Sequence, residues 1–245
     1  MEQVTLDNQE IANLLQRRAS LDSEFSKDCW RWLCQQVVTV DEAADEGTAR
    51  LRRWPKEKKY LQEMIQILKN ERFVIIPKSR RMMVTWLVSA YFVHDARYNA
   101  HSADFIISET ETKAAFVVDK RCYHIEQNLR HEEFRQNVGT LRTKTGLIGR
   151  MTYPNGSYIW GLASTGDALR TFTATKVLVD EIEFIDQGPA LTRALIPLIE
   201  NGAQAIFVSS SNGPTGIIAE YCRDVKFGKW EDMVNLSGEY VQYAS

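Results

Sequence analysis

Residues 73–86 read FVIIPKSRRMMVTW, and the rest of the chain is organised around them. Residues 73–76 are all apolar, which is typical of a buried β-strand. A short loop rich in cationic side chains follows, and over residues 84–96 the apolar side chains recur at helical spacing. The sequence therefore predicts a strand, a basic loop and a helix, in that order.

The basic loop is a candidate anion site. Backbone N–H groups and the positive end of a helix dipole converge where a strand end meets a helix start. Lys78, Arg80 and Arg81 add full positive charges there, and Thr85 offers a hydroxyl at the position where a nucleoside triphosphatase would hold Mg²⁺. The alternative interpretation is a solvated basic loop that caps a buried strand.

The loop departs from the standard phosphate-loop motif, G-x-x-x-x-G-K-[ST]. The motif positions hold Lys78, Met83, Val84 and Thr85, so both glycines and the usual lysine are replaced. A residue other than glycine at position 83 must avoid the left-handed backbone or accept it at a cost of about 1 kcal/mol or more. Taken alone, the loop is a weak signal of phosphate binding.

The composition is that of an ordinary globular protein, with 245 residues, 44% of them apolar, and a formal charge of −2. This charge excludes a uniformly basic nucleic-acid coat, so any contact with nucleic acid would be local. The first residues lack a basic segment followed by an apolar core, and no apolar run reaches membrane-spanning length. We therefore expect neither export nor membrane insertion.

Cysteines and histidines give no sign of a metal site. Neither C-x-x-C nor H-E-x-x-H occurs, and the four cysteines are too few for a disulfide scaffold. We expect reduced thiols, and histidines that pack in the core or face solvent.

The rest of the chain alternates buried strands with helices. Buried strands are predicted at residues 104–108, 175–181 and 205–213, helices at 60–69, 109–129 and 188–200, and a hairpin at 151–160. Ahead of them, helical patterns at 6–21 and 25–38 predict a helical appendage at 1–48, followed by one large domain at 49–245. This order implies an α/β fold with a doubly wound, mainly parallel sheet, whose ligands bind at the carboxyl ends of the strands.

A basic segment at residues 50–59 contains an aromatic side chain and a proline. Trp54 and Pro55 are candidates for the pocket of a nucleotide base, because a flat apolar ring and a rigid turn could sandwich the base. A solvated charged turn ahead of a helix is the alternative.

Two acids, Asp180 and Glu181, end the strand at 175–181. They could simply cap the next helix. Beside a cationic phosphate loop, however, Asp180 can hold Mg²⁺ opposite Thr85, commonly through water, and Glu181 can orient or deprotonate the attacking water. Residues 209–212 supply hydroxyl and amide groups at the next strand end, suited to a γ-phosphate.

These motifs together resemble the ATPase part of large terminase subunits, which package double-stranded DNA into the procapsids of tailed phages. The resemblance lies in KSRRMMVTW at 78–86, VLVDE at 177–181 and SSSN at 209–212, and it extends over residues 50–212. It implies a fold of the phosphate-loop NTPase type, with ATP and Mg²⁺ as cofactors. The nucleotide contacts it implies are Lys78, Ser79, Arg80, Arg81, Met82, Met83, Val84, Thr85, Ser211 and Asn212.

The resemblance also implies a role for Arg170, since related motors carry an arginine here that reaches the ATP of a neighbouring subunit. A surface arginine in a glycine-containing loop is the alternative interpretation. The implied partners are double-stranded DNA, the portal protein, the small terminase subunit and the procapsid. The implied setting is the cytoplasm of an infected bacterial host, with a ring homo-oligomer as the active form and a monomer as the isolated form.

The motifs and the resemblance together imply an ATP-hydrolysing DNA translocase. The alternatives are a helicase-like, nucleic-acid-dependent ATPase and a catalytically degenerate phosphate-loop module for assembly or binding. Terminase large subunits usually continue into a ribonuclease-H-like nuclease domain. Because nothing past Asn212 supplies the acidic cluster of a two-metal nuclease, we expect a shortened chain or a stand-alone motor.

Overall fold

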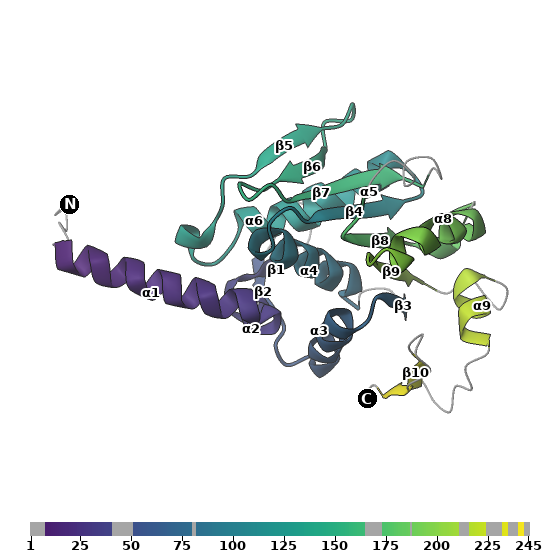
Figure 1. Ribbon diagram of the computed structural model, residues 1–245, viewed down its shortest axis with the longest axis horizontal. Coiled ribbons are helices and arrows are strands. Elements are labelled where there is room, and N and C mark those ends of the chain that lie inside the picture. The colour runs from purple at the N-terminus through teal and green to yellow at the C-terminus, as the bar shows by residue number, and fades with distance from the viewer. Residues whose placement is uncertain are drawn as a thin grey trace.

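The computed structural model describes residues 8–40, 51–79, 82–164, 173–186, 188–210, 216–223, 232–234 and 240–242. A mixed, seven-stranded sheet with the order β3-β9-β8-β4-β7-β6-β5 forms its centre (Figure 1). The strands in this order are β3 Phe73–Pro77, β9 Gln204–Ser209, β8 Lys176–Asp180, β4 Ala103–Ser108, β7 Tyr158–Ala163, β6 Ile148–Thr152 and β5 Gly139–Arg142. Neighbours from β3 to β7 are parallel, whereas β6 and β5 pair antiparallel. The predicted α/β fold, the mainly parallel sheet and the hairpin are confirmed.

Alternating side chains of the parallel strands build two apolar cores, one on each face of the sheet. Val74, Ile106 and Ile206 belong to a core that includes α3 and α4, whereas Phe105 and Phe207 pack with α8 in the other. The helices are α1 Asn8–Lys27, α2 Cys29–Gln36, α3 Lys59–Asn70, α4 Val84–Tyr98, α5 Glu111–Val117, α6 His124–Gln127, α8 Gly188–Glu200 and α9 Ile217–Arg223. Helices on both faces explain why the central strands read as continuous apolar runs.

The helix predicted at 109–129 is built from three segments. α5 is followed directly by a π-helical segment, η1 Val118–Tyr123, and then by α6. The short 3-10 helices are η2 Glu132–Phe134 and η3 Ile182–Phe184. Within the described residues no helix is long and apolar enough to cross a membrane.

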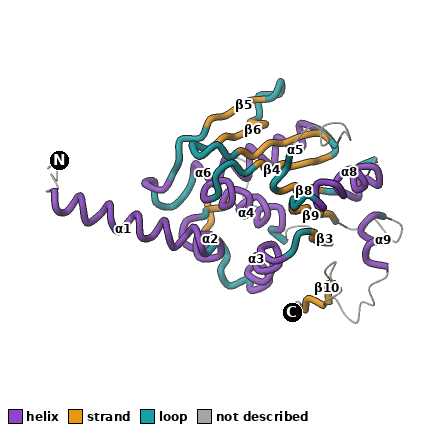
Figure 2. The backbone as a smooth tube through the Cα atoms, in the orientation of Figure 1, coloured by secondary structure: helices purple, strands orange, loops and turns teal. Residues whose placement is uncertain are grey.

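The boundary between the two N-terminal helices differs from the predicted one. The break falls at Asp28, whose side chain accepts a hydrogen bond from the Arg31 N–H at 2.9 Å and so caps α2. Beyond α2 the chain forms β1 Val38–Val40, which pairs with β2 Leu51–Arg53. α1 extends away from the sheet (Figures 1 and 2), but Trp32 of α2 packs in the same core as α4. The division of the chain at residue 48 stays a prediction.

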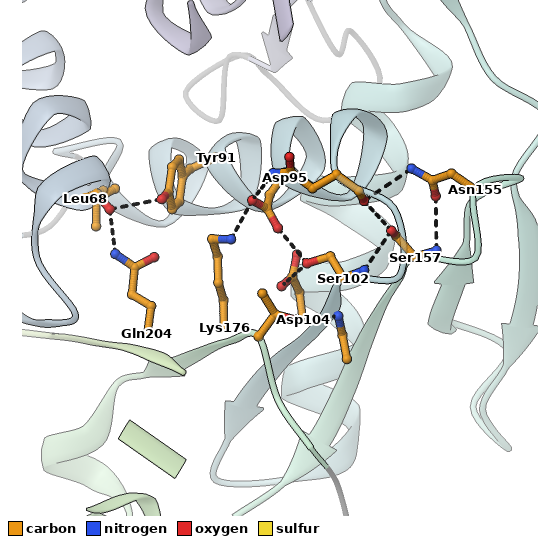
Figure 3. Close-up of polar contacts among 12 residues, drawn as sticks. Leu68, Tyr91, Asp95, Ser102, Asp104, Asn155, Ser157, Lys176 and Gln204 are labelled. Carbon is orange, nitrogen blue, oxygen red and sulfur yellow. Dashed lines mark hydrogen bonds and ion pairs between the residues drawn. The ribbon is translucent and has the colours of Figure 1, made fainter. Parts of the chain in front are cut away.

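A buried polar network ties α4 to β4 and β8 at the amino ends of these strands (Figure 3). Lys176 Nζ lies 2.5 Å from Asp95 Oδ1, and Ser102 Oγ lies 2.6 Å from Asp95 Oδ2 and 3.0 Å from Asp104 Oδ1. Burial raises the pKa of the Asp104 carboxyl well above its ordinary value. Because the Ser102 hydroxyl has one proton to donate, we assign it to Asp95, and Asp104 then keeps its own proton and donates it to Ser102.

Candidate functional site

The order of the sheet brings three segments that are distant in sequence to one edge. β9 lies between β3 and β8, so the carboxyl ends of these parallel strands are neighbours. Lys78 follows β3, Ser209 ends β9 and Asp180 ends β8. The Lys78 N–H continues the ladder by donating to the Ser209 carbonyl at 2.9 Å. The carboxyl edge of the sheet therefore brings together the start of the predicted basic loop, the acids at the end of β8 and the serines at the end of β9. This is the edge at which the sequence predicts ligand binding.

Glu181 is held by donors from both neighbouring segments. Its Oε1 lies 2.6 Å from Lys78 Nζ, and its Oε2 accepts hydrogen bonds from Ser210 N, Ser210 Oγ and Ser209 Oγ at 3.0, 3.1 and 3.2 Å. Burial raises the pKa of the Glu181 carboxyl, but the hydrogen bonds from Lys78 and Ser210 outweigh burial and hold that pKa below its ordinary value. The side chain is a fixed, charged carboxylate. Its backbone is left-handed, with φ 56°.

Thr85 and Asp180 form a second contact at the same edge. Thr85 Oγ1 donates to Asp180 Oδ1 at 3.3 Å. Burial raises the pKa of Asp180 to about 6, with a further rise from the charge of Glu181, while Lys78 and Thr85 act in the opposite direction. A hydroxyl and a carboxylate suit Mg²⁺, which is often bound by one or two protein oxygens together with waters and phosphates. Among the described residues, no cluster of three or more His, Cys, Asp or Glu side chains that could hold a metal occurs.

The loop before α4 adopts the backbone that the missing glycine would favour. Met83 is the N-cap of α4 with φ 56° and ψ 13°, so this residue accepts the left-handed conformation. Tyr60 of α3 donates from its hydroxyl to the Met82 carbonyl at 3.2 Å. Val84 is buried, whereas Ser79 is exposed. The sequence pattern did not single out Tyr60, because only the packing of α3 brings it to this loop.

The Trp54 ring is buried, so it does not offer an exposed face on which a nucleotide base could stack. Its side chain is 3% exposed and belongs to the same core as α3 and α4. Pro55 is half-buried. Contact of Trp54 and Pro55 with a nucleotide base stays a prediction, and it would require the indole ring to become accessible.

Several predicted site residues lie outside the described part of the chain. These are Arg80, Arg81, Arg170, Ser211 and Asn212. Their proposed contacts with nucleotide therefore stay predictions.

Arg121 is a further cation near the site that the sequence did not reveal. Its guanidinium lies 4.5 Å from the centre of the Trp86 ring, and Trp86 is next to Thr85 in sequence. Burial raises the pKa of Asp180, and the charge of Arg121 partly opposes that rise. Arg121 belongs to η1, and it reaches this place because η1 packs against α4. No local pattern encodes that packing.

The fold is shared with packaging ATPases of phages, although no protein-family model matches the chain. The large terminase of bacteriophage HK97 is similar with a TM-score of 0.58 and 12% identity, over 81% of this chain and 40% of that one. The N-terminal domain of the phi29 DNA packaging ATPase gives 0.54 and 9%, over 74% of this chain and 94% of that one. The large terminase ATPase domain of Thermus phage P74-26 gives 0.51 and 16%, over 68% and 73%. At these identities the likeness establishes the fold.

Proposed function

We propose that this chain is the ATP-hydrolysing part of a terminase large subunit, which drives double-stranded DNA into a procapsid. The observation that carries the proposal is the meeting of Lys78, Thr85, Asp180 and Glu181 at one sheet edge, through contacts of 2.6 and 3.3 Å. Cation, hydroxyl and two acids are the parts that phosphoryl transfer requires. The fold, shared with phage packaging ATPase domains, supports the same reading.

Each of these side chains has a role in the proposal. Lys78, together with Arg80 and Arg81, neutralises phosphate oxygens. Thr85 and Asp180 hold Mg²⁺, which supplies charge stabilisation to the phosphates when it is bound. The backbone N–H groups at the start of α4 face the same anion.

Glu181 is the proposed base for the attacking water. Its carboxylate stays charged at neutral pH because the hydrogen bonds from Lys78 and Ser210 offset the effect of burial on its pKa, so it is available to orient the attacking water or accept its proton. Phosphate oxygens would compete with Glu181 for Lys78. Ser209 and Ser210 would then still orient the carboxylate through its other oxygen.

We propose that the working form is a ring of subunits around DNA, with residues 49–245 as the ATPase domain of each. In such a ring Arg170 would complete the site of the neighbouring subunit. The portal protein, the small terminase subunit and the procapsid would be the partners, in the cytoplasm of an infected bacterial host.

One observation favours a second candidate, a degenerate phosphate-loop module without catalysis. Met83 holds a left-handed backbone that glycine would adopt at less cost. The rate of ATP hydrolysis, measured with and without duplex DNA and partner subunits, separates the two. We expect hydrolysis that DNA and assembly stimulate, and no hydrolysis under any of these conditions would support the binding module. A strand-separation assay excludes a helicase if duplex DNA stays paired while ATP is consumed.

A further inference from the structure

The segment between residues 134 and 166 carries only positive charge. It contains no Asp or Glu, although the whole chain has 32 acidic residues against 30 Lys and Arg. Its cations are Arg135, Arg142, Lys144 and Arg150. Arg135 is paired with Glu132 at 3.1 Å. The other three form what we call the basic hairpin, since they belong to β5, β6 and the turn between them.

The basic hairpin is accessible. β5 is the edge strand, all four of its residues are exposed, and the hairpin stands away from the helices at one end of the sheet (Figure 1). Arg142 and Lys144 are exposed. Among the ion pairs between described residues, none involves Arg142, Lys144 or Arg150. The charges of Arg142 and Lys144 are therefore available to an anionic partner, and Arg150 is half-buried beside them.

The two arginines are also held in place. The Arg142 guanidinium donates to the Gly146 carbonyl at 2.6 Å, which uses one of its five N–H groups. The Arg150 guanidinium lies 4.2 Å from the centre of the Tyr158 ring and 5.2 Å from that of Trp160, its cross-strand partner. Preorganised guanidinium groups lose little conformational entropy when they bind phosphate.

We propose that the basic hairpin contacts the phosphate backbone of double-stranded DNA, an inference that rests on the proposed function as a DNA motor. A motor must grip every sequence, and phosphate contacts are independent of sequence. A two-stranded β-ribbon also fits the major groove in width. The hairpin lies at the opposite edge of the sheet from β3 and its loop, so nucleotide and DNA can be bound together.

The test is the binding of a short fluorescent DNA duplex over a range of salt concentrations, without nucleotide. The variant is the double substitution Arg142→Ala with Lys144→Ala, and the control is Arg17→Ala with Lys113→Ala, which removes the same charge from α1 and α5. For the hairpin variant we expect affinity to fall at least about tenfold at low salt and the slope of log K against log salt to decrease by about 2. The control variant should have the same slope of log K against log salt as the unaltered chain.

Binding of a fluorescent ATP analogue, which the hairpin variant should keep, is the second measurement. Equal DNA affinity of the variant and the unaltered chain, or no duplex binding by the unaltered chain, would overturn the hairpin contact and leave the ATPase untouched. Failure of the unaltered chain to hydrolyse ATP even with duplex DNA and partner subunits would overturn the proposed function while the DNA measurement still stands. If the variant binds DNA normally but stops turnover in the assembled ring, the cations serve a neighbouring nucleotide and the inference is wrong.

Discussion

Lys78 and Glu181 form an ion pair across the carboxyl edge of the sheet, with Nζ 2.6 Å from Oε1, although 103 positions separate them in sequence. The lysine side chain is 11% exposed and the glutamate side chain 37% exposed. The pair joins the two groups to which we assign phosphate binding and water activation. Phosphate binding and the restraint of Glu181 therefore depend on the same ammonium group.

Glu181→Gln should preserve Mg·ATP binding and suppress turnover by at least about a hundredfold, because glutamine keeps the shape and removes the base. Calorimetry measures binding, and phosphate release measures turnover. Glu200→Gln, at the exposed end of α8, is the matched control and should keep its rate. An unchanged rate for Glu181→Gln would show that another group activates the water.

Lys78→Ala and Arg80→Ala should each weaken nucleotide binding, since a charge-assisted contact with phosphate contributes roughly 1.5–3 kcal/mol. Calorimetric titration should then give affinities lower by about ten- to a hundredfold. Lys113→Ala serves as the control, because Lys113 lies on α5 and is paired with Glu109. If both loop variants bind ATP as tightly as the unaltered chain, the loop is a solvated turn.

Met83→Gly should bind nucleotide at least as well as the unaltered chain, and it should raise the free energy of unfolding by up to about 1 kcal/mol. The reason is the left-handed backbone at this position. Met82→Gly is the matched control, because both methionine side chains pack against the same core but the φ of Met82 is not positive, so glycine at position 82 relieves no backbone strain. Urea unfolding measures the free energy of unfolding of the two variants, and calorimetry measures their nucleotide binding. Equal destabilisation by the two substitutions would argue against strain at Met83.

Asp104→Asn should stabilise the protein more at pH 8 than at about pH 5. The folded chain keeps Asp104 protonated because burial raises its pKa, whereas the carboxyl in the unfolded chain ionises near its ordinary pKa of 3.8. The stability contributed by the acid form is therefore complete below that pH and is lost as pH rises towards the folded pKa. Asparagine cannot ionise and can still donate to Ser102. Urea unfolding at both pH values, with exposed Asp186→Asn as the control, should show this difference, and a stability gain that shrinks with rising pH would contradict it.

Arg170→Ala should abolish turnover in the assembled motor and leave the ATP affinity of the monomer nearly intact, because the arginine would act on the neighbour's site. Mixtures of Arg170→Ala and Glu181→Gln subunits should regain some activity, since some junctions then combine an intact Arg170 with an intact Glu181. The measurement is the ATPase rate against the mixing ratio, with assembly confirmed. No recovery at any ratio would favour the alternative interpretation of Arg170 as a surface arginine. Arg142 and Arg150 would then be the next candidates to test.

Local patterns were enough to predict the elements that carry the site. The apolar run at 73–76, the helical spacing from residue 84 and the run that ends at Asp180 correspond to β3, α4 and β8. A strand buried on both faces needs apolar side chains throughout, and a helix repeats every 3.6 residues, so both leave a signature in short windows. The α/β fold and the edge at which the site forms follow from these signatures.

Which of these side chains touch depends on the tertiary structure. It placed β9 between β3 and β8, paired Lys78 with Glu181, buried Trp54 in the core and brought Arg121 over Trp86. It also set the boundary between the first two helices at Asp28, because the Asp28 side chain caps α2 although the helical spacing of the sequence continues past it. Strand order and side-chain contacts between distant segments depend on how complete faces pack against each other, and a short window of sequence does not contain that information.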